Sequence, residues 1–400
     1  MTTTRRQALI ATASLAIGAV LPFRAGAFVF PPEVLQDKYP ADPSFDAAVS
    51  LSDLEAIAHR RLDAMSEAYI DGAAGDEITL RWNREAYDKI KILPRVLHDV
   101  SVVDTRTTVL GIPLDFPILL GPTALHKLAH PDGELATARA AASAHALMGL
   151  STMSSTTLED VAAASNSPKW FQLYVQKDKG FTAELVQRAV KSGYKALVVT
   201  VDTPTEGARN RQQRAGFHLP PGVDLANLRG LKTASGRAPG TEREVFENIL
   251  PDKLTWKEIE WLQSLSSLPV LLKGILNPED AALAVKQGVA GVIVSNHGAR
   301  NLDTVPATIE ALPRITDRVA GRITVLVDGG VRRGTDVLKA LARGANAVLV
   351  GRPIFYGLSA AGEAGVVKML GILRKEFEMA MALSGRTRIS EIVPEVIWKE

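Results

Sequence analysis

The stretch GVIVSNHGARNLD, residues 291–303, contains an apolar run that stops abruptly at polar residues. Short runs without polar residues are typical of strands buried on both faces, as in a parallel sheet covered by helices. His297 and Arg300 follow the run closely, which places a base and a permanent cation at the carboxyl end of the predicted strand. Such a pair suits a substrate that carries a carboxylate. Taken alone, the same residues would also fit a solvated basic turn.

Seven other apolar runs end in polar or glycine residues in the same way. They lie at 117–120, 147–150, 170–171, 196–199, 270–272, 325–327 and 347–350. Helical patterns occupy the intervals, among them 181–192, 278–287 and 335–343. Eight strand–helix units predict an α/β fold, a (β/α)8 TIM barrel from about residue 116, in which the chemistry lies at the carboxyl ends of the strands.

The segments outside the predicted barrel form an N-terminal extension and one long loop. Residues 51–72 carry a helical pattern, and a Pro-punctuated section follows it. Residues 207–256, after the fourth predicted strand, are rich in Gly, Pro and charged residues, and loops of this length are usually functional. We therefore expect one enzyme domain over residues 51–400, with a helical extension before the barrel and a long loop after strand four.

The first 27 residues have the pattern of an export signal. A twin-arginine pair precedes an apolar stretch over 8–21 and a small-residue site at 25–27, although the full consensus after Arg6 is not present. We expect export to the periplasm and a linker or arm over 28–50. A membrane anchor is the alternative, but the apolar stretch is short for a spanning helix.

Composition narrows the class of protein. The 400 residues are 46% hydrophobic, which is enough for one large core. Removing the three arginines of the predicted signal leaves 43 basic against 44 acidic residues, so a nucleic-acid partner is disfavoured. The chain has no Cys, which is compatible with an oxidising compartment, and no metal site is predicted.

Three sets of strand ends carry residues suited to a cofactor. Residues 328–332 and 351–352 combine Gly with Arg at adjacent strand ends, where barrels often bind phosphate, although Gly can also serve tight turns alone. Lys273 could neutralise charge on a ring system, form a Schiff base or pair with a neighbouring acid. Polar side chains at three other strand ends could hydrogen-bond a planar heterocycle; they are Ser151, Gln172 and Thr200.

Together the motifs resemble those of the FMN-dependent L-2-hydroxy acid oxidase and dehydrogenase family, which includes glycolate oxidase, lactate oxidase, mandelate dehydrogenase and the flavin domain of flavocytochrome b2. They are YIDGAAGDE (69–77), PTALHKLAHPDGE (122–134), FQLYV (171–175), TVDTP (200–204), LLKG (271–274), SNHGARNLD (295–303), DGGVRRGTDVLKAL (328–341) and VGRP (350–353). The resemblance covers about residue 51 to the C-terminus. It implies FMN as cofactor and oxidation of an L-2-hydroxy acid to the 2-oxo acid.

The resemblance also implies roles for individual residues. His297 would be the base, Asp202 would pair with it and raise its basicity, and Tyr174 would contact the substrate hydroxyl. The substrate carboxylate would be held by Arg209, Arg300 and Tyr69. Lys273 would stabilise the anionic reduced ring. The isoalloxazine would be lined by Pro122, Thr123, Ala124, Ser151, Gln172 and Thr200. The ribityl and phosphate groups would be held by Asp328, Gly329, Gly330, Arg332, Gly351 and Arg352, with Ser295 supporting the strand end.

Two departures from the family pattern bear on the substrate. Ala299 replaces a customary Gly and restricts the backbone before Arg300. Met153 stands where short-chain oxidases often have an aromatic residue, so we expect a lactate-like or larger substrate. The acceptor would be O2, a quinone or a cytochrome, and the family resemblance implies a homo-oligomer, often a tetramer. The alternatives are a flavin-barrel isomerase of the isopentenyl diphosphate type, which would need no carboxylate clamp, and a non-catalytic flavin-binding protein.

Overall fold

A computed structural model describes residues 45–231 and 254–399 of the chain. The predicted export signal and most of the predicted arm lie outside these ranges, as does the middle of the predicted long loop. Within the described ranges, none of the helices combines the length and the apolar character needed to cross a membrane.

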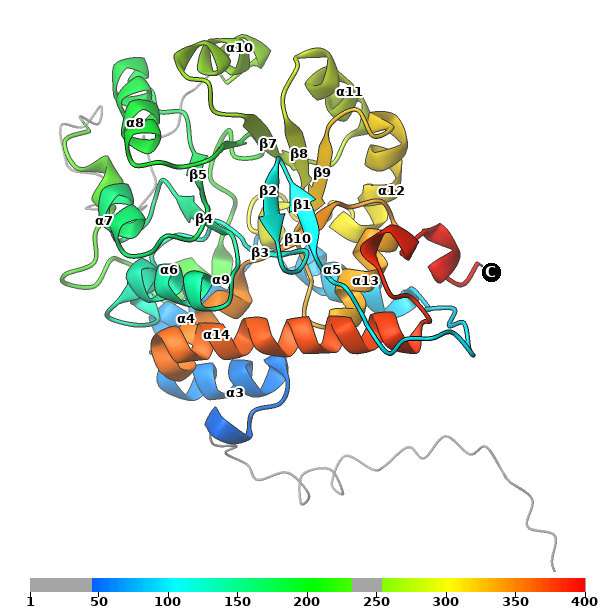
Figure 1. The fold of residues 1–400 in the computed structure, drawn as a ribbon. Coiled ribbons are helices and arrows are strands. Elements are labelled where there is room, and N and C mark those ends of the chain that lie inside the picture. Colours follow the sequence, from blue (N-terminus) through cyan, green and yellow to red (C-terminus); the bar gives the residue numbers. More distant parts are fainter. Residues whose placement is uncertain (1–44, 232–253, 400) are drawn as a thin grey trace, which may run out of the picture. The chain divides into compact units, whose positions relative to one another are not determined.

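Eight parallel strands close into a barrel in the order β10-β3-β4-β5-β6-β7-β8-β9 (Figure 1). Their bounds are β3 Ile118–Leu120, β4 Met148–Ser151, β5 Lys169–Leu173, β6 Leu197–Thr200, β7 Val270–Ile275, β8 Gly291–Val294, β9 Thr324–Val327 and β10 Ala347–Val350. Each predicted apolar run forms one of these strands, so the (β/α)8 prediction is confirmed. The strands are almost entirely buried because helices cover the outside and side chains fill the interior.

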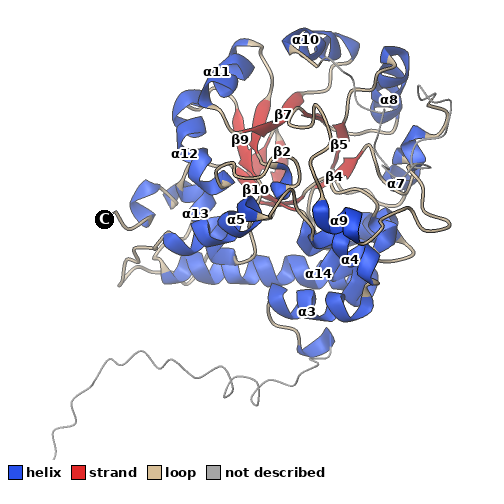
Figure 2. Ribbon diagram, turned by 180° about the vertical axis from the view of Figure 1, so that it is seen from behind, coloured by secondary structure: helices blue, strands red, loops and turns tan. Residues whose placement is uncertain are grey.

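Helices alternate with the strands and form the outer layer (Figures 1 and 2). Their bounds are α6 Gly133–Ser143, α7 Leu158–Ala163, α8 Lys179–Lys191, α10 Trp256–Leu265, α11 Pro278–Lys286, α12 Thr308–Val319, α13 Gly334–Ala342 and α14 Arg352–Leu383. Capping side chains fix where two of these helices begin. Asp178 accepts a hydrogen bond from the Phe181 amide at the start of α8, and Asn277 caps the start of α11. The helical patterns predicted between the strands therefore correspond to α8, α11 and α13.

The predicted N-terminal extension is helical, but the helical pattern over residues 51–72 forms two helices instead of one. The bounds are α3 Leu51–Arg61, α4 Ala64–Asp71 and α5 Ile78–Lys89. The break falls at Asp63, whose carboxylate accepts hydrogen bonds from the amides of Met65 and Ser66 and so starts α4. Helix α3 packs along α14, which carries the extension on the outside of the barrel (Figure 1).

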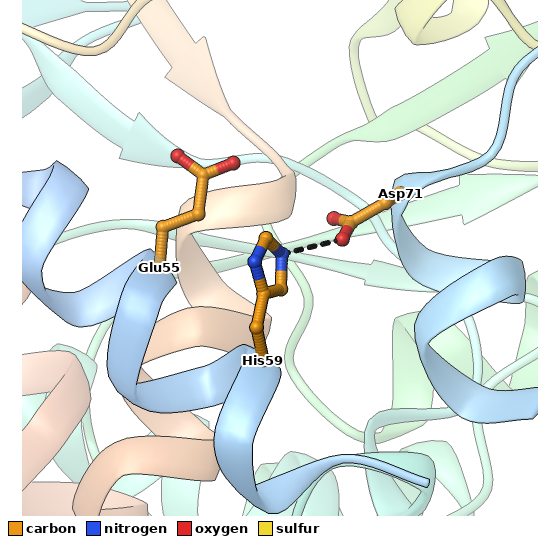
Figure 3. A group of neighbouring side chains, drawn as sticks. All are labelled: Glu55, His59 and Asp71. Carbon is orange, nitrogen blue, oxygen red and sulfur yellow. Dashed lines mark hydrogen bonds and ion pairs between the residues drawn. The ribbon is translucent and has the colours of Figure 1, made fainter. Parts of the chain in front are cut away.

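Glu55, His59 and Asp71 gather where α3, α4 and α14 meet (Figure 3). Nε2 of His59 lies 2.7 Å from Oδ2 of Asp71, and the Tyr356 hydroxyl donates to Oδ1 of Asp71 over 2.7 Å. Both oxygens of Asp71 thus have partners on neighbouring helices. We interpret the cluster as a brace that fastens the extension to the first turns of α14.

The sequence analysis predicted neither helix α5 nor the hairpin that follows it. A two-stranded antiparallel hairpin, β1 Thr107–Val109 and β2 Ile112–Leu114, occupies the Pro-punctuated section before the barrel. Its turn residues, Leu110 and Gly111, both have positive φ, which is the conformation of a tight two-residue hairpin turn. Val109 and Leu114 pack with inward-facing strand residues such as Trp170. The hairpin therefore covers the amino-terminal end of the barrel, and Figure 1 shows it across the strands.

The loop after β6 is long, as predicted, and its described part contains α9 Asn210–Arg214. Helix α9 packs against α4, and Figure 2 shows the two side by side. The remaining short helices are 3-10 turns: η1 Phe45–Ala47, η2 His126–Leu128, η3 Ala226–Leu228, η4 His297–Ala299, η5 Ile389–Glu391 and η6 Pro394–Val396. The loop and the extension thus meet beside the barrel.

Candidate active site

A cavity opens at the carboxyl ends of the barrel strands, and it gathers residues from almost every strand end. The predicted site residues that line it are Tyr69, Pro122, Thr123, Ala124, Ser151, Met153, Gln172, Tyr174, Thr200, Arg209, Lys273, His297, Arg300, Asp328, Gly329, Gly330, Arg332, Gly351 and Arg352. The other two predicted residues, Asp202 and Ser295, lie behind this wall and hydrogen-bond to residues in it. The extension contributes Tyr69 from α4.

His297, in the cavity wall, contacts Asp202 behind it. Nδ1 of His297 lies 2.8 Å from Oδ1 of Asp202. An ionised carboxylate can only accept, so Nδ1 carries the proton and Nε2 keeps its lone pair. Nε2 lies 3.2 Å from the hydroxyl of Tyr174, which also lines the cavity. The imidazole therefore presents a proton acceptor to the cavity.

The surroundings of His297 lower the pKa of its imidazole. Burial is the largest cause, and the charge of Lys273 adds to it, while Asp202 acts in the opposite direction. Asp202 acts to raise the pKa of His297, but burial penalises the imidazolium more strongly, so the net shift is downward. A neutral imidazole at neutral pH is the form that a general base requires.

The backbone at His297 is unusual. His297, Gly298 and Ala299 have φ values of 58°, 61° and 66°, in the left-handed region. For His and Ala this conformation costs about 1 kcal/mol or more per residue, and such strain is typical of functional sites. Asn296 supports the turn, since its side-chain oxygen accepts from the Ala299 amide over 3.2 Å. The Ala in place of Gly thus keeps the left-handed conformation at an energetic cost.

Two arginines lie on one side of the cavity. Nη1 of Arg300 donates to the carbonyl oxygens of Tyr69 and Gly72 over 2.6 and 2.8 Å, and its guanidinium lies 4.8 Å from the Tyr69 ring. Burial, followed by repulsion from Arg209, lowers the pKa of Arg300 to about 9. A buried cation with a depressed pKa is stabilised by an incoming anion, so this side suits a carboxylate.

The loops after β9 and β10, residues 328–332 and 351–352, also line the cavity. They carry the predicted phosphate site, and we call them the phosphate loops. Gly329 and Gly330 have φ of 92° and 86°. A Cβ at Gly330 would lie 2.0 Å from the carbonyl oxygen of Asn83 in α5, so only Gly permits this approach of helix and loop. Arg332 adds a cation beside these backbone groups. Arg352 also lines the cavity, but its guanidinium donates to three backbone carbonyls and therefore braces the wall.

Comparisons with known proteins decide the family. The model of the family described as FMN-dependent dehydrogenase matches residues 58–399. The chain belongs to this family. An L-lactate oxidase from Nostoc sp. is 49% identical over 359 residues, which is 87% of this chain and 98% of that protein. Glycolate oxidase 1 from Zea mays is 48% identical over 354 residues, with 88% and 96% covered.

Solved structures agree with this assignment. The crystal structure of a mandelate oxidase with benzoyl-formic acid has a TM-score of 0.80 and 40% identity to this chain, with 88% of this chain and 98% of that chain covered. The relatives are named as oxidases of 2-hydroxy acids. This member of the FMN-dependent dehydrogenase family is therefore a flavoenzyme of 2-hydroxy acid oxidation that uses FMN.

The residues present fit FMN. Oδ1 of Asp328 is buried and finds no hydrogen-bond partner among the described residues, so it can accept from a hydroxyl of the ribityl chain. Gln172 accepts from the Ser151 hydroxyl over 3.1 Å and donates to the Thr200 hydroxyl over 2.9 Å. These three strand ends form one polar edge for a planar ring.

Lys273 forms an ion pair with a neighbouring acid, which was one of the three alternatives that the sequence left open. Its Nζ lies 3.2 Å from Oδ2 of Asp328 and donates to the Ser295 hydroxyl over 2.9 Å. Burial alone would depress the pKa of Lys273, but Asp328 and Asp202 outweigh it and hold the pKa above its usual value. A protonated Lys273 is a poor nucleophile, which argues against the Schiff base and favours a fixed positive charge.

Three residues near the site were not singled out from the sequence: Asn301, Phe217 and Glu206. The Asn301 side chain donates to the Asp202 carbonyl and the Thr203 hydroxyl, over 2.9 and 2.8 Å, and so steadies Asp202. Phe217 stacks on Tyr69 with ring centroids 4.6 Å apart. Glu206 lines the cavity. Only Asn301 lay within a recognised motif, and the others carry no local signal of proximity.

Proposed function

We propose that this enzyme oxidises an L-2-hydroxy acid to the corresponding 2-oxo acid. One observation supports the proposal most strongly: His297 and the two guanidinium groups of Arg209 and Arg300 line one cavity. A base beside two cations suits a substrate that carries a hydroxyl and a carboxylate on adjacent carbons. A flavin-barrel isomerase would not need this clamp, and a non-catalytic binding protein would not need the His297–Asp202 pair.

Each residue group would perform one task. Arg209, Arg300 and Tyr69 would bind the carboxylate and so fix the orientation of C2. Nε2 of His297 would accept a proton from the substrate, and Asp202 would stabilise the imidazolium that results. Bound FMN supplies the two-electron acceptor, and the fixed charge of Lys273 would favour the negative charge that develops there.

The cavity wall supports a substrate larger than glycolate. Met153 is buried and lines the cavity, where its flexible side chain can adapt to different substituents on C2. We therefore propose a lactate-like or larger side chain. Relatives named L-lactate oxidase and mandelate oxidase are in keeping with this range.

The proposal also covers the electron acceptor, the localisation and the oligomeric state of the enzyme. We propose O2 as the acceptor, because the relatives are named as oxidases, with a quinone or cytochrome as the alternative. From the sequence of residues 1–27 we propose export to the periplasm. A homo-oligomer, tetrameric as the family resemblance implies, also stays a proposal that light scattering of the purified protein would test.

Anaerobic bleaching of the flavin tests the function. The FMN-loaded enzyme would be mixed with glycolate, lactate, and longer aliphatic and aromatic L-2-hydroxy acids, and the absorbance of the oxidised flavin followed. Bleaching by one class identifies the substrate, and rapid recolouring in air identifies an oxidase. Slow recolouring that a quinone accelerates would instead favour a respiratory acceptor. If no acid bleaches the flavin, the proposed function is wrong.

A variant tests the base. His297→Ala should retain FMN, because the described contacts of the phosphate loops do not involve this side chain, but should no longer be reduced by substrate. Retention of flavin is measured by absorbance after gel filtration, and reduction by stopped flow. Reduction at the wild-type rate would contradict the role of His297.

A further inference from the structure

Glu206 is an acidic residue in the wall of a cavity that binds an anion under the proposed function. Nη1 of Arg209 donates to Oε1 of Glu206 over 2.8 Å. The Arg209 side chain is 10% exposed and that of Glu206 is 26% exposed, so the pair is largely sheltered from water. A carboxylate of the protein itself therefore contacts one of the two guanidinium groups proposed for the substrate carboxylate.

The backbone between the two residues is tightly packed. A Cβ at Gly207 would lie 2.3 Å from the carbonyl oxygen of Asn301 and 2.5 Å from that of Arg300, so only Gly fits there. Nε of Arg209 also faces the carbonyl oxygen of Arg300 at 3.5 Å. The segment that carries Glu206 thus lies directly against the segment that carries Arg300.

The charge of Glu206 affects how many anionic groups a bound substrate can carry. Arg209 and Arg300 contribute two positive charges to this side of the cavity, and Glu206 offsets one. One substrate carboxylate then completes the neutralisation, whereas a second anionic group would meet the Glu206 carboxylate. Charges interact strongly where water is largely excluded, and like charges placed together are unfavourable. Burial is the main cause of the raised pKa of Tyr69, and Glu206 adds to it, so its charge acts inside the cavity.

We infer that Glu206 selects substrates by charge: it admits hydroxy acids with one carboxylate and disfavours those whose side chain carries a second anionic group. The inference rests on the proposed function, because it assumes that Arg209 and Arg300 bind the substrate carboxylate. Glu206 is thereby a specificity-determining residue, distinct in role from the base and from the clamp.

The test compares two anions that the enzyme cannot oxidise. Propionate and malonate have three carbons each, lack a hydroxyl group, and carry one and two carboxylates. Their Kd values would be measured from the perturbation of the flavin spectrum in the FMN-loaded wild-type enzyme and in Glu206→Gln. The matched control is Glu184→Gln, which removes the same charge from an exposed position on α8, away from the cavity lining.

We expect Glu206→Gln to lower the Kd for malonate relative to propionate by roughly tenfold, since removing a like charge at a sheltered site favours the dianion. Glu184→Gln should leave the ratio of the two Kd values unchanged. A ratio in Glu206→Gln equal to that of the wild type would overturn the inference. Equal shifts in both variants would also overturn it, because the effect would then follow net charge alone.

A second variant guards against a folding defect. Glu206→Asp keeps the charge and shortens the side chain, so it should keep the preference for propionate that Glu206→Gln loses. Loss of the preference in both variants would contradict charge selection. Because neither propionate nor malonate is oxidised, the ratio of their Kd values can be measured whether or not a hydroxy acid bleaches the flavin. If a hydroxy acid bleaches the flavin and the ratio does not move, only the role of Glu206 is wrong.

Discussion

Replacing Asp202 by Asn tests the link between the His297–Asp202 contact and the chemistry. The nitrogen–oxygen distance of 2.8 Å joins two partly buried side chains, 17% and 12% exposed. It places the charge centres of imidazolium and carboxylate about 4 Å apart, where their attraction is about 4 kcal/mol at an effective dielectric constant of about 20. Asn removes the charge, and its amide group can donate to Nδ1, which moves the proton to Nε2.

The expected loss follows from that energy. About 4 kcal/mol of imidazolium stabilisation corresponds to a fall of about three powers of ten in the rate of flavin reduction. Stopped-flow absorbance under anaerobic conditions measures this rate directly as a function of pH. Asp202 raises the pKa of His297 in the wild type, so its removal should lower that pKa further. The acid limb of the pH profile should therefore move to lower pH while the plateau falls.

The control for this experiment is Asp224→Asn. The Asp224 side chain is 47% exposed and is paired with Arg229 in the long loop after β6. It does not line the cavity, so its loss should leave the rate of flavin reduction within about twofold. A plateau in Asp202→Asn equal to the wild-type plateau, or an acid limb that moves to higher pH, would refute the reasoning.

Three further variants probe the supporting structure. Lys273→Met should lower the free energy of unfolding of the apoprotein by about 3 kcal/mol in denaturant titrations, because it leaves a buried carboxylate unpaired. Phe217→Ala should raise KM by about fivefold and largely keep kcat, since it removes the ring stacked on Tyr69. Gly330→Ala should weaken FMN binding at least about tenfold by ultrafiltration, whereas Gly193→Ala, also at positive φ but in open space, should not.

Each of these variants has an outcome that would contradict its premise. An unchanged unfolding free energy in Lys273→Met would mean that its ion pair contributes nothing to the fold. A fall in kcat with constant KM in Phe217→Ala would place Phe217 in the chemical step instead of substrate binding. Equal FMN affinities in Gly330→Ala and Gly193→Ala would show that the close approach at Gly330 does not shape the phosphate loop.

Much of the fold could be predicted because its signals are local. A short run such as residues 347–350 is apolar throughout, and in a chain of this length only a strand covered on both faces needs that pattern repeatedly. The break between α3 and α4 had a local cause too, the capping by Asp63, but a continuous helical pattern hid it. The hairpin at β1 and β2 was missed because three-residue strands are too short for a periodic signal.

In the candidate site, too, residues with a local sequence signal could be predicted and residues without one could not. Parallel strands in a barrel bring their carboxyl ends together, so polar residues at these ends could be assigned to one cavity without coordinates, and the cavity contains nearly all of them. Glu206 and Phe217 could not be assigned in this way. Both belong to a loop without periodicity, and their closeness to Arg209 and Tyr69 depends on how that loop packs.

By itself, the sequence determined the barrel and the cluster of polar residues at its carboxyl end, because these follow from the order and spacing of residues along the chain. The class of cofactor came from the resemblance of the motifs to a known family. Only the tertiary structure decided the state of those residues. Burial sets the lowered pKa of His297. Closure of the barrel brings Asp328, which follows β9, to 3.2 Å from Lys273 on β7, although β8 separates the two strands. Electrostatic energies depend on distance and exclusion of water, and both arise when segments far apart in the chain pack together.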